Sequence, residues 1–125
     1  MHILRTGVDL IEVERVQAAI QRHGQRLLSR VFTPQELEDC GQNTKSLAAR
    51  FAAKEAVSKA LGTGLGPVGF QDIEIQRGPL GEPVLCLSGR AESLAHRLGL
   101  STWAISLSHS DSHAIAFVVA SGPPE

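Results

Sequence analysis

Several features that would mark a secreted or membrane protein are missing from this sequence. Its apolar runs are far too short to cross a bilayer, and the N-terminal segment MHILRTGVDLIEVERV meets charged residues too early for a signal peptide. There are only two cysteines, Cys40 and Cys86, which cannot build a disulfide framework. We therefore expect a cytoplasmic protein with free thiols.

Strong charge of either sign and repetitive sequence are also lacking. The formal net charge is −1 at pH 7, which argues against a general nucleic-acid binder but leaves local charged patches open. No internal repeat or low-complexity tract interrupts the 125 residues. Hydrophobic residues make up 42% and charged residues 20%, so we expect one folded domain over residues 1–125.

Hydrophobic periodicity predicts the secondary structure. Strands are predicted at 3–13, 70–76, 84–87, 102–110 and 113–121, and helices at 13–32 (interrupted at Gly24), 34–41, 44–61 and 89–98. Thr33, Pro34 and Glu36 form a capping-box pattern at the start of the second helix. Adjacent strand pairs suggest hairpins, so we expect an α+β fold with antiparallel strands packed on a long Ala-rich helix, in the order β-α-α-α-β-β-α-β-β.

The Ala-rich helix carries charges that an apolar helix should not have. Arg50, Lys54, Glu55 and Lys59 lie among Ala, Phe, Val and Leu in RFAAKEAVSKAL. At 100° per residue, Glu55 and Lys59 lie about 40° apart on one face. A solvated Glu–Lys pair would stabilise the helix by about 0.2–0.5 kcal/mol, whereas charges in apolar surroundings have to be paired or to bind something. Both interpretations are open from the helix alone.

Two further signals accompany this helix. The GTGLG segment that follows it is typical of a helix C-cap, but its glycines would also let backbone N–H groups approach a phosphate. Asp9, flanked by Val8 and Leu10, could cap the next helix or pair with an arginine. Together with Glu55 it could instead hold Mg²⁺, because two carboxylates completed by phosphate oxygens and water form a typical magnesium site.

Taken together, these motifs resemble a known family. GVDLIEVERV, FTPQEL, RFAAKEAVSKALGTG, FQDIEI, GEPVL and SLSHSDSHAIAFVV occur in the order found in the holo-[acyl-carrier-protein] synthases, the short single-domain branch of the 4'-phosphopantetheinyl transferases. The resemblance covers nearly the whole chain, and AAKEAVSKA with the early Asp9 is its most specific part.

The resemblance implies a reaction, a metal and an assembly. Such enzymes move the phosphopantetheine arm of coenzyme A onto a serine of apo acyl carrier protein, for fatty acid or polyketide biosynthesis, and release adenosine 3',5'-bisphosphate. It implies Mg²⁺ bound by Asp9 and Glu55, with Glu55 as a candidate base for the serine and Lys59 neutralising the leaving group. It also implies a homotrimer with active sites at the subunit interfaces.

The resemblance further assigns residues to the two substrates. Arg50, Lys59, Gly62, Gly64 and His109 are expected to bind coenzyme A. The carrier protein, which is acidic, is expected to dock on the basic residues of the first helical segment, namely Arg15, Arg22, Arg26 and Arg30. Scattered charges of this kind are more often an ordinary solvated face.

Two segments fit the resemblance less well. The family often has a basic cluster before LAARFAAKEA, where this chain has GQNTKS with only Lys45, which leaves contacts to coenzyme A from that side in doubt. His109, Asp111 and His113 alternate as zinc ligands on one strand face would, but the turn expected at Asp111 breaks that arrangement.

Two other classes of protein compete with the enzyme. A non-catalytic coenzyme A- or carrier-protein-binding module would keep Arg50 and the Gly-rich loop but would not need Asp9 and Glu55 together. A Mg²⁺-dependent nucleotide phosphohydrolase would be expected to show more than two metal carboxylates, and the sequence offers no third candidate in similar surroundings. The paired carboxylates favour the transferase.

Overall fold

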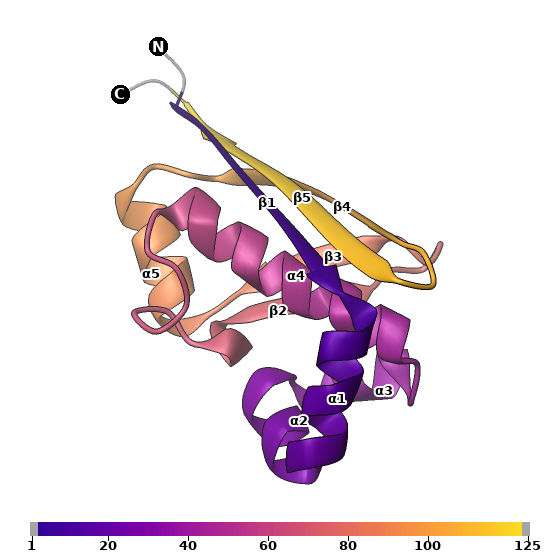
Figure 1. Ribbon diagram of the computed structural model, residues 1–125. Helices are drawn as coiled ribbons and strands as arrows, with labels where there is room; N and C mark the ends of the chain where they lie inside the picture. Colours follow the sequence, from indigo (N-terminus) through magenta and orange to yellow (C-terminus); the bar gives the residue numbers. More distant parts are fainter. Residues whose placement is uncertain (1–2, 124–125) are drawn as a thin grey trace.

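The structure, a computed structural model that describes residues 3–123, contains two antiparallel sheets (Figure 1). The larger sheet has the order β1-β5-β4, with β1 at Ile3–Glu12, β4 at Thr102–His109 and β5 at His113–Gly122. The smaller sheet pairs β2 (Ile73–Arg77) with β3 (Pro83–Leu87). Because β1 pairs with β5 along its full length, the first and last strands of the chain lie side by side.

Five α-helices and one 3₁₀ turn connect these strands within the described residues. Their bounds are α1 Val13–His23, α2 Gln25–Val31, α3 Pro34–Cys40, α4 Thr44–Leu61, η1 Phe70–Asp72 and α5 Gly89–Arg97. Helices α1, α2 and α3 gather at one end of the larger sheet, and α5 lies near the opposite end of α4 (Figure 1).

Helix α4 runs between the two sheets and forms the centre of the molecule (Figure 1). Its small side chains, such as Ala52, Ala56 and Ala60, are fully or almost fully buried against the inner face of the larger sheet. A Cβ atom on Gly7 of β1 would lie only 1.9 Å from the backbone oxygen of Ala56. Only glycine fits there, so the alanines and Gly7 together bring β1 directly against α4.

The fold class and most element bounds agree with the sequence. The helix at 44–61 and the capping box are confirmed, the latter by Thr33 Oγ1 accepting from the Glu36 N–H and Thr33 N–H donating to Glu36 Oε1. The expected strand at 70–76 is wrong at its start. The Asp72 carboxylate accepts from the Gly69 N–H and closes a 3₁₀ turn, so β2 begins only at Ile73.

The first helical segment also differs in detail. Gly24 has a φ of 57°, in the left-handed region that favours glycine, and it separates α1 from α2 as two distinct helices. The turn predicted near Asp111 is present, between the end of β4 and the start of β5. Over residues 3–123, no helix combines the length and apolar character that a membrane crossing requires.

The outer face of the larger sheet is apolar and uncovered in the single chain. Large side chains there have exposed fractions between 39% and 66%; they are Leu4, Val8 and Leu10 of β1 with Ile115 and Phe117 of β5. The register sets Val8 opposite Phe117 and Leu10 opposite Ile115, which makes one continuous patch. A contiguous apolar surface of this kind marks an interaction site in a soluble protein.

Candidate active site

The four charged residues of α4 from Arg50 to Lys59 lie in different environments. Arg50 and Lys54 are buried, with exposed fractions of 6% and 0%, whereas Glu55 is half-buried and Lys59 is exposed. Arg50 and Glu55 are five positions apart, which places them about 140° apart around the helix. Glu55 and Lys59 therefore line one cleft, Arg50 lines another, and Lys54 lies in the core.

The first cleft has a volume of about 590 Å³ and contains the predicted carboxylates. Asp9, Glu55 and Lys59 line it together with Arg15. The rest of its wall is mostly apolar and comes from β1, α1, α2 and α4; it includes Leu10, Ile11, Val16, Leu27, Val31, Phe32 and Phe51. Charged groups thus meet at the edge of an apolar hollow, an arrangement typical of ligand sites.

Asp9 is held against α4 by its strand and by Lys59. Asp9 lies two residues after Gly7, on the same side of β1, and Gly7 brings that side into contact with α4. Lys59 Nζ lies 3.1 Å from Asp9 Oδ1 and donates a second hydrogen bond to the Val8 carbonyl oxygen at 3.0 Å. The Asp9 side chain is only 18% exposed, so its charge is partly desolvated and faces a cation.

Glu55 lies close enough to Asp9 for the two charges to interact. Partial burial raises the pKa of Glu55, the charge of Asp9 raises it further, and the ammonium of Lys59 opposes both effects. Because the two carboxylates repel each other and are partly desolvated, a cation bound between them would be stabilised by both charges.

The donor set of this cleft suits Mg²⁺ in particular. Among residues 3–123 no group of three or more His, Cys, Asp or Glu side chains could hold a metal. Asp9 and Glu55 would therefore supply two oxygen ligands and leave the remaining positions to phosphate and water. Mg²⁺ is usually bound in this way, through one or two carboxylates plus substrate phosphates.

The second cleft, of about 210 Å³, contains the other two predicted binding residues. Arg50 and His109 both line it, together with Arg77 of β2 and residues of the β2–β3 hairpin. Arg50 Nε donates to the Ile75 carbonyl oxygen at 3.1 Å. The Nη groups of Arg50 bond to no described residue. Every fully buried side-chain nitrogen and oxygen among the described residues has a partner, so these Nη groups are not fully buried and reach the cleft surface. Two arginines and a histidine there could bind an anion.

The two glycines predicted to bind coenzyme A complete the end of α4. Gly62 adopts the left-handed conformation with a φ of 82°, and its N–H donates to the Lys59 and Ser58 carbonyl oxygens. The Gly64 N–H also donates to the Ser58 carbonyl oxygen. These N–H groups are already bonded within the chain, so a direct role for Gly62 and Gly64 at a phosphate stays a prediction.

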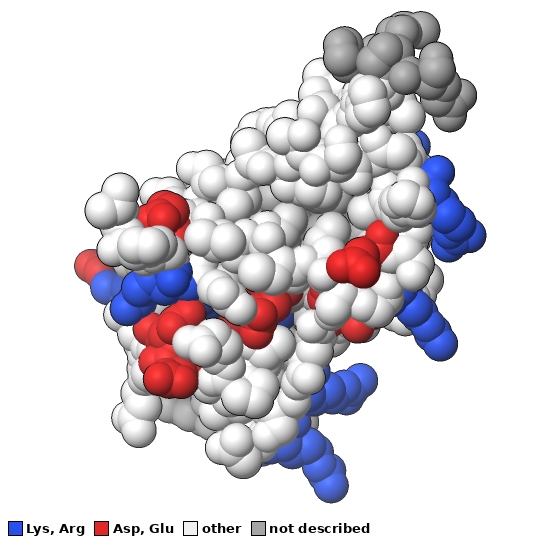
Figure 2. Space-filling model, turned by 180° about the vertical axis from the view of Figure 1, so that it is seen from behind, with Lys and Arg blue, Asp and Glu red and all other residues white. Residues whose placement is uncertain are grey.

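The basic residues assigned to the carrier protein are exposed. Arg15 and Arg22 project from α1, and Arg26 and Arg30 from α2. Figure 2 shows Lys and Arg side chains projecting from the lower end of the molecule, where Figure 1 places α1 and α2. Arg15 also borders the first cleft, which links this basic surface to the carboxylates.

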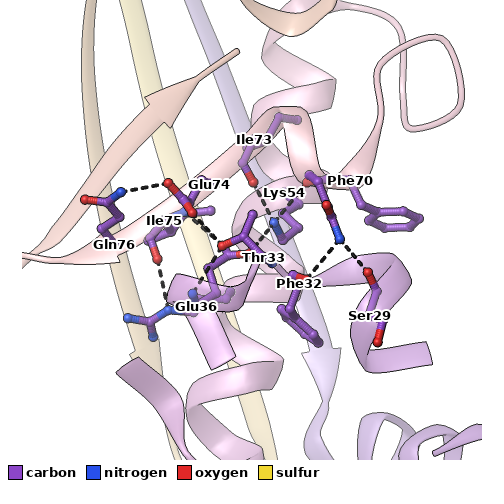
Figure 3. Close-up of polar contacts among 12 residues, drawn as sticks. Ser29, Phe32, Thr33, Glu36, Lys54, Phe70, Ile73, Glu74, Ile75 and Gln76 are labelled. Carbon is purple, nitrogen blue, oxygen red and sulfur yellow. Dashed lines mark hydrogen bonds and ion pairs between the residues drawn. The ribbon is translucent and has the colours of Figure 1, made fainter. Parts of the chain in front are cut away.

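A buried ion pair between Glu36 and Lys54 was missed by the sequence interpretation. Lys54 Nζ lies 2.8 Å from Glu36 Oε1, and both side chains are fully buried. Burial lowers the pKa of Lys54, while the Glu36 carboxylate opposes this shift. Figure 3 shows Lys54 bonded to Glu36 and to the carbonyl groups of Phe70 and Ile73. The available signal was Lys54 in its apolar surroundings; Glu36 lies in the polar segment TPQELEDC, where the sequence indicates it only as part of the capping box.

His113 and Lys45 lie near the β4–β5 turn, and neither of them lines the first cleft. Lys45 forms an ion pair with Asp111, which lowers the pKa of that exposed carboxyl group through a hydrogen bond and charge attraction. His113 bonds the Ser112 hydroxyl at 2.9 Å. The turn separates His109 from His113, so they do not continue one strand face.

The protein is an α+β domain with two acidic side chains and a lysine at one cleft and arginines at another, a set of groups that could bind phosphate and a metal. Residues 5–118 match the model of the 4'-phosphopantetheinyl transferase superfamily. The chain therefore belongs to this superfamily.

Known proteins narrow the likeness further. The chain is 47% identical to a holo-[acyl-carrier-protein] synthase of Herpetosiphon aurantiacus, over 96% of this chain and 100% of that protein. Among solved structures, the synthase of Helicobacter pylori in complex with coenzyme A has a TM-score of 0.85 and 33% identity, covering 92% of this chain and 98% of that one. The synthase of Bacillus anthracis in complex with CoA (3',5'-ADP) has a TM-score of 0.80 and 33% identity, covering 98% and 100%.

Proposed function

We propose that this chain transfers the 4'-phosphopantetheine arm of coenzyme A to a serine of apo acyl carrier protein, in a Mg²⁺-dependent reaction that releases adenosine 3',5'-bisphosphate. The names of its relatives and the coenzyme A bound in two of the solved ones support the substrates. The observation that carries the mechanism is the meeting of Asp9, Glu55 and Lys59 at the first cleft.

Asp9 and Glu55 would hold the Mg²⁺ ion. When bound, the ion would neutralise and orient the pyrophosphate of coenzyme A. Lys59 lies one turn beyond Glu55 and has half of its side chain exposed to the cleft, so its ammonium can exchange Asp9 for a phosphate oxygen. The chain thus supplies positioning and charge neutralisation, which phosphoryl-type transfer needs more than covalent help.

The reaction moves one phosphorus from one oxygen to another. The serine oxygen bonds to the phosphorus that carries the pantetheine, and the bond from that phosphorus to the bridging oxygen breaks. Glu55 takes the serine proton, directly or through a water molecule. Lys59 stabilises the negative charge that develops on the departing bisphosphate.

The second cleft would bind the phosphate-rich end of coenzyme A. The Nη groups of Arg50, with Arg77 and His109 beside them, present donors that match a phosphate monoester. The two clefts share no lining residue. Because Arg50 and Glu55 also project about 140° apart from α4, one molecule of coenzyme A that uses both sets of residues is better served by two copies of the chain.

This split favours a homotrimer with active sites between subunits. The outer face of the larger sheet, described above, is the apolar surface on which copies of the chain would pack. A cyclic trimer would use two different edges of each subunit at every interface, which allows one subunit to supply the first cleft and its neighbour the second.

The acidic carrier protein would dock on the arginines of α1 and α2. Arg15 lies on both the basic surface and the rim of the first cleft, so a protein bound there would present its serine next to Glu55. Exposed charges of this kind steer encounter more than they add affinity.

A mass measurement tests the proposal. Apo acyl carrier protein incubated with this protein, coenzyme A and Mg²⁺ should gain the mass of one phosphopantetheine group. Glu55→Gln should abolish the gain while the protein stays folded. If coenzyme A binds with normal affinity and the carrier protein keeps its apo mass, the non-catalytic binding module is the better interpretation.

A further inference from the structure

The buried network around Lys54 ends at the same backbone group that holds Arg50. The Ile75 N–H donates to Glu36 Oε2 at 2.9 Å, and the Ile75 carbonyl oxygen accepts from Arg50 Nε at 3.1 Å. The N–H of Ile75 in β2 is thus held by a side chain of α3, and its carbonyl oxygen by a side chain of α4 (Figure 3). Ile75 itself is fully buried, so no water competes for either bond.

Every donor of Lys54 and both oxygens of Glu36 are used in this network. Lys54 Nζ donates to Glu36 Oε1, the Phe70 carbonyl oxygen and the Ile73 carbonyl oxygen, which uses all the protons of an ammonium. Glu36 Oε1 accepts from Lys54 and from the Thr33 N–H, and Oε2 is left for Ile75. Since both charged groups are fully buried, any other arrangement would leave a desolvated charge without a partner.

Arg50 depends on this backbone position for its orientation. Its Nε group bonds only the Ile75 carbonyl oxygen among the described residues, and this bond sets the plane of the guanidinium. The Nη groups then point to the surface of the second cleft. A shift of the Ile75 carbonyl would turn them away from a ligand without removing any atom from the cleft.

We propose that Glu36 and Lys54 are positioning residues for Arg50: through the Ile75 backbone they fix the guanidinium so that it meets the 3'-phosphate end of coenzyme A. The inference rests on the proposed function of the second cleft.

The test replaces the ion pair by apolar side chains of similar length. The double variant Glu36→Met/Lys54→Met removes both charges together and leaves no buried charge unpaired, but four backbone groups that bond to the pair lose these partners, so it should fold with a lower unfolding temperature. Its dissociation constant for adenosine 3',5'-bisphosphate, measured by calorimetry, should rise about tenfold, as is typical when a group that orients a ligand-binding side chain is lost. The KM for carrier protein should stay unchanged.

A control in the same region separates positioning from general loosening. Gln71 donates to the Ser29 and Phe32 carbonyl oxygens but not to Ile75. Gln71→Ala should lower the unfolding temperature and leave bisphosphate binding as in the wild type. If the Met/Met variant does not fold, Glu36→Gln serves instead: it keeps the volume but has only one oxygen, so it cannot accept from Lys54, Thr33 and Ile75 together.

A triple variant distinguishes the inference from the function on which it rests. If the pair acts through Arg50, the triple variant that combines Arg50→Ala with the Met/Met pair should bind the bisphosphate no more weakly than Arg50→Ala alone. Additive losses, or unchanged binding in the folded Met/Met variant, would overturn the positioning role while Arg50 keeps its own. Unchanged binding in Arg50→Ala would instead remove the second cleft from the proposed function.

Discussion

The four charged residues of α4 from Arg50 to Lys59 lie in three different environments. Lys54 forms an ion pair with Glu36 in the core, and buried Arg50 donates a hydrogen bond to a backbone carbonyl group. Glu55 and Lys59 lie at the first cleft with Asp9. Residue type and spacing alone could not separate these cases, because a buried structural charge and a functional charge look alike in sequence.

Removal of the Glu55 charge should stabilise the metal-free protein. The pKa of Glu55 is raised in the folded state, so the folded protein binds its proton more tightly than the unfolded chain does. The stability that this group contributes is present at pH below its unfolded pKa of about 4.5 and is lost as pH rises through the raised value. Without Mg²⁺ at neutral pH, Glu55→Gln should therefore unfold at a higher temperature than the wild type.

The same variant should lose its response to the metal. Added Mg²⁺ should raise the unfolding temperature of the wild type, because a ligand that binds only the folded state stabilises it. Glu55→Gln and Asp9→Ala should show little or no such rise in calorimetry and should have no transferase activity. A wild-type rise in either folded variant would refute the assignment of that carboxylate to the metal.

Lys59→Met should affect turnover more than substrate binding. Methionine keeps most of the apolar stem but has no charge for the leaving bisphosphate, whose negative charge develops in the transition state. We expect kcat to fall by about two orders of magnitude, a loss typical of removing one electrostatic donor, with a smaller change in the KM for coenzyme A. Steady-state kinetics with each substrate varied would decide; a change in KM alone contradicts a role in the leaving step.

At the scale of elements, the close contact between β1 and α4 sets the geometry of the first cleft. Gly7 permits this contact, and Asp9 follows two residues later on the same side of the strand. The contact depends on the absence of a side chain in β1 and on small side chains in α4. A change that separates the two elements should therefore impair catalysis without touching any charged group.

Gly7→Ala tests that dependence. The added Cβ would lie 1.9 Å from a backbone oxygen, so β1 has to shift, which should cost about 1–3 kcal/mol of stability and draw Asp9 away from Glu55 and Lys59. Gly69→Ala is the matched control, because its Cβ would come no closer than 3.4 Å to any atom outside its chain neighbours. Urea unfolding and activity below the transition should show large losses for the first variant only. Full activity in a folded Gly7→Ala would show that the cleft tolerates the shift.

Element boundaries show where sequence reasoning succeeds and where it fails. The helix at 44–61 and the capping box at Thr33 were predictable because their signals are local: side-chain spacing, a cap and a terminal glycine. The start of β2 was not, because a hydrogen bond from Gly69 to Asp72 overrides the apolar alternation at Phe70. The Glu36–Lys54 pair was out of reach for a third reason: it joins two helices whose approach depends on tertiary packing.

Reversal of charge on α1 and α2 should weaken the use of carrier protein alone. Arg15 and Arg26 are exposed, so their contribution to encounter should be screened by salt. Arg15→Glu with Arg26→Glu should raise the KM for carrier protein, leave the KM for coenzyme A nearly unchanged, and flatten the dependence of the rate on ionic strength. Kinetics across a salt series would check this. Equal damage to both substrates would place these arginines in the coenzyme A site or in the fold.

At the scale of the whole molecule, the two halves of the proposed site lie in separate clefts of one chain. The first cleft has the carboxylates and Lys59, the second has Arg50 and His109, and no residue lines both. The apolar outer face of the larger sheet offers a surface on which further copies can pack. Assembly and catalysis should therefore fail together: Phe117→Asp should reduce the molar mass in solution and abolish transfer.

Mixing of two inactive variants tests whether subunits share sites. Glu55→Gln damages only the first cleft and Arg50→Ala only the second. In a cyclic trimer, an interface works when the subunit with an intact first cleft meets a neighbour with an intact second cleft, so random co-assembly at equal amounts should restore about one quarter of the wild-type sites. The variants would be co-expressed with different tags, purified as mixed assemblies and assayed beside each parent. If the mixed assemblies stay at the parental rates, both clefts must serve the same chain, and the proposal of interface sites fails even if the trimer itself is found.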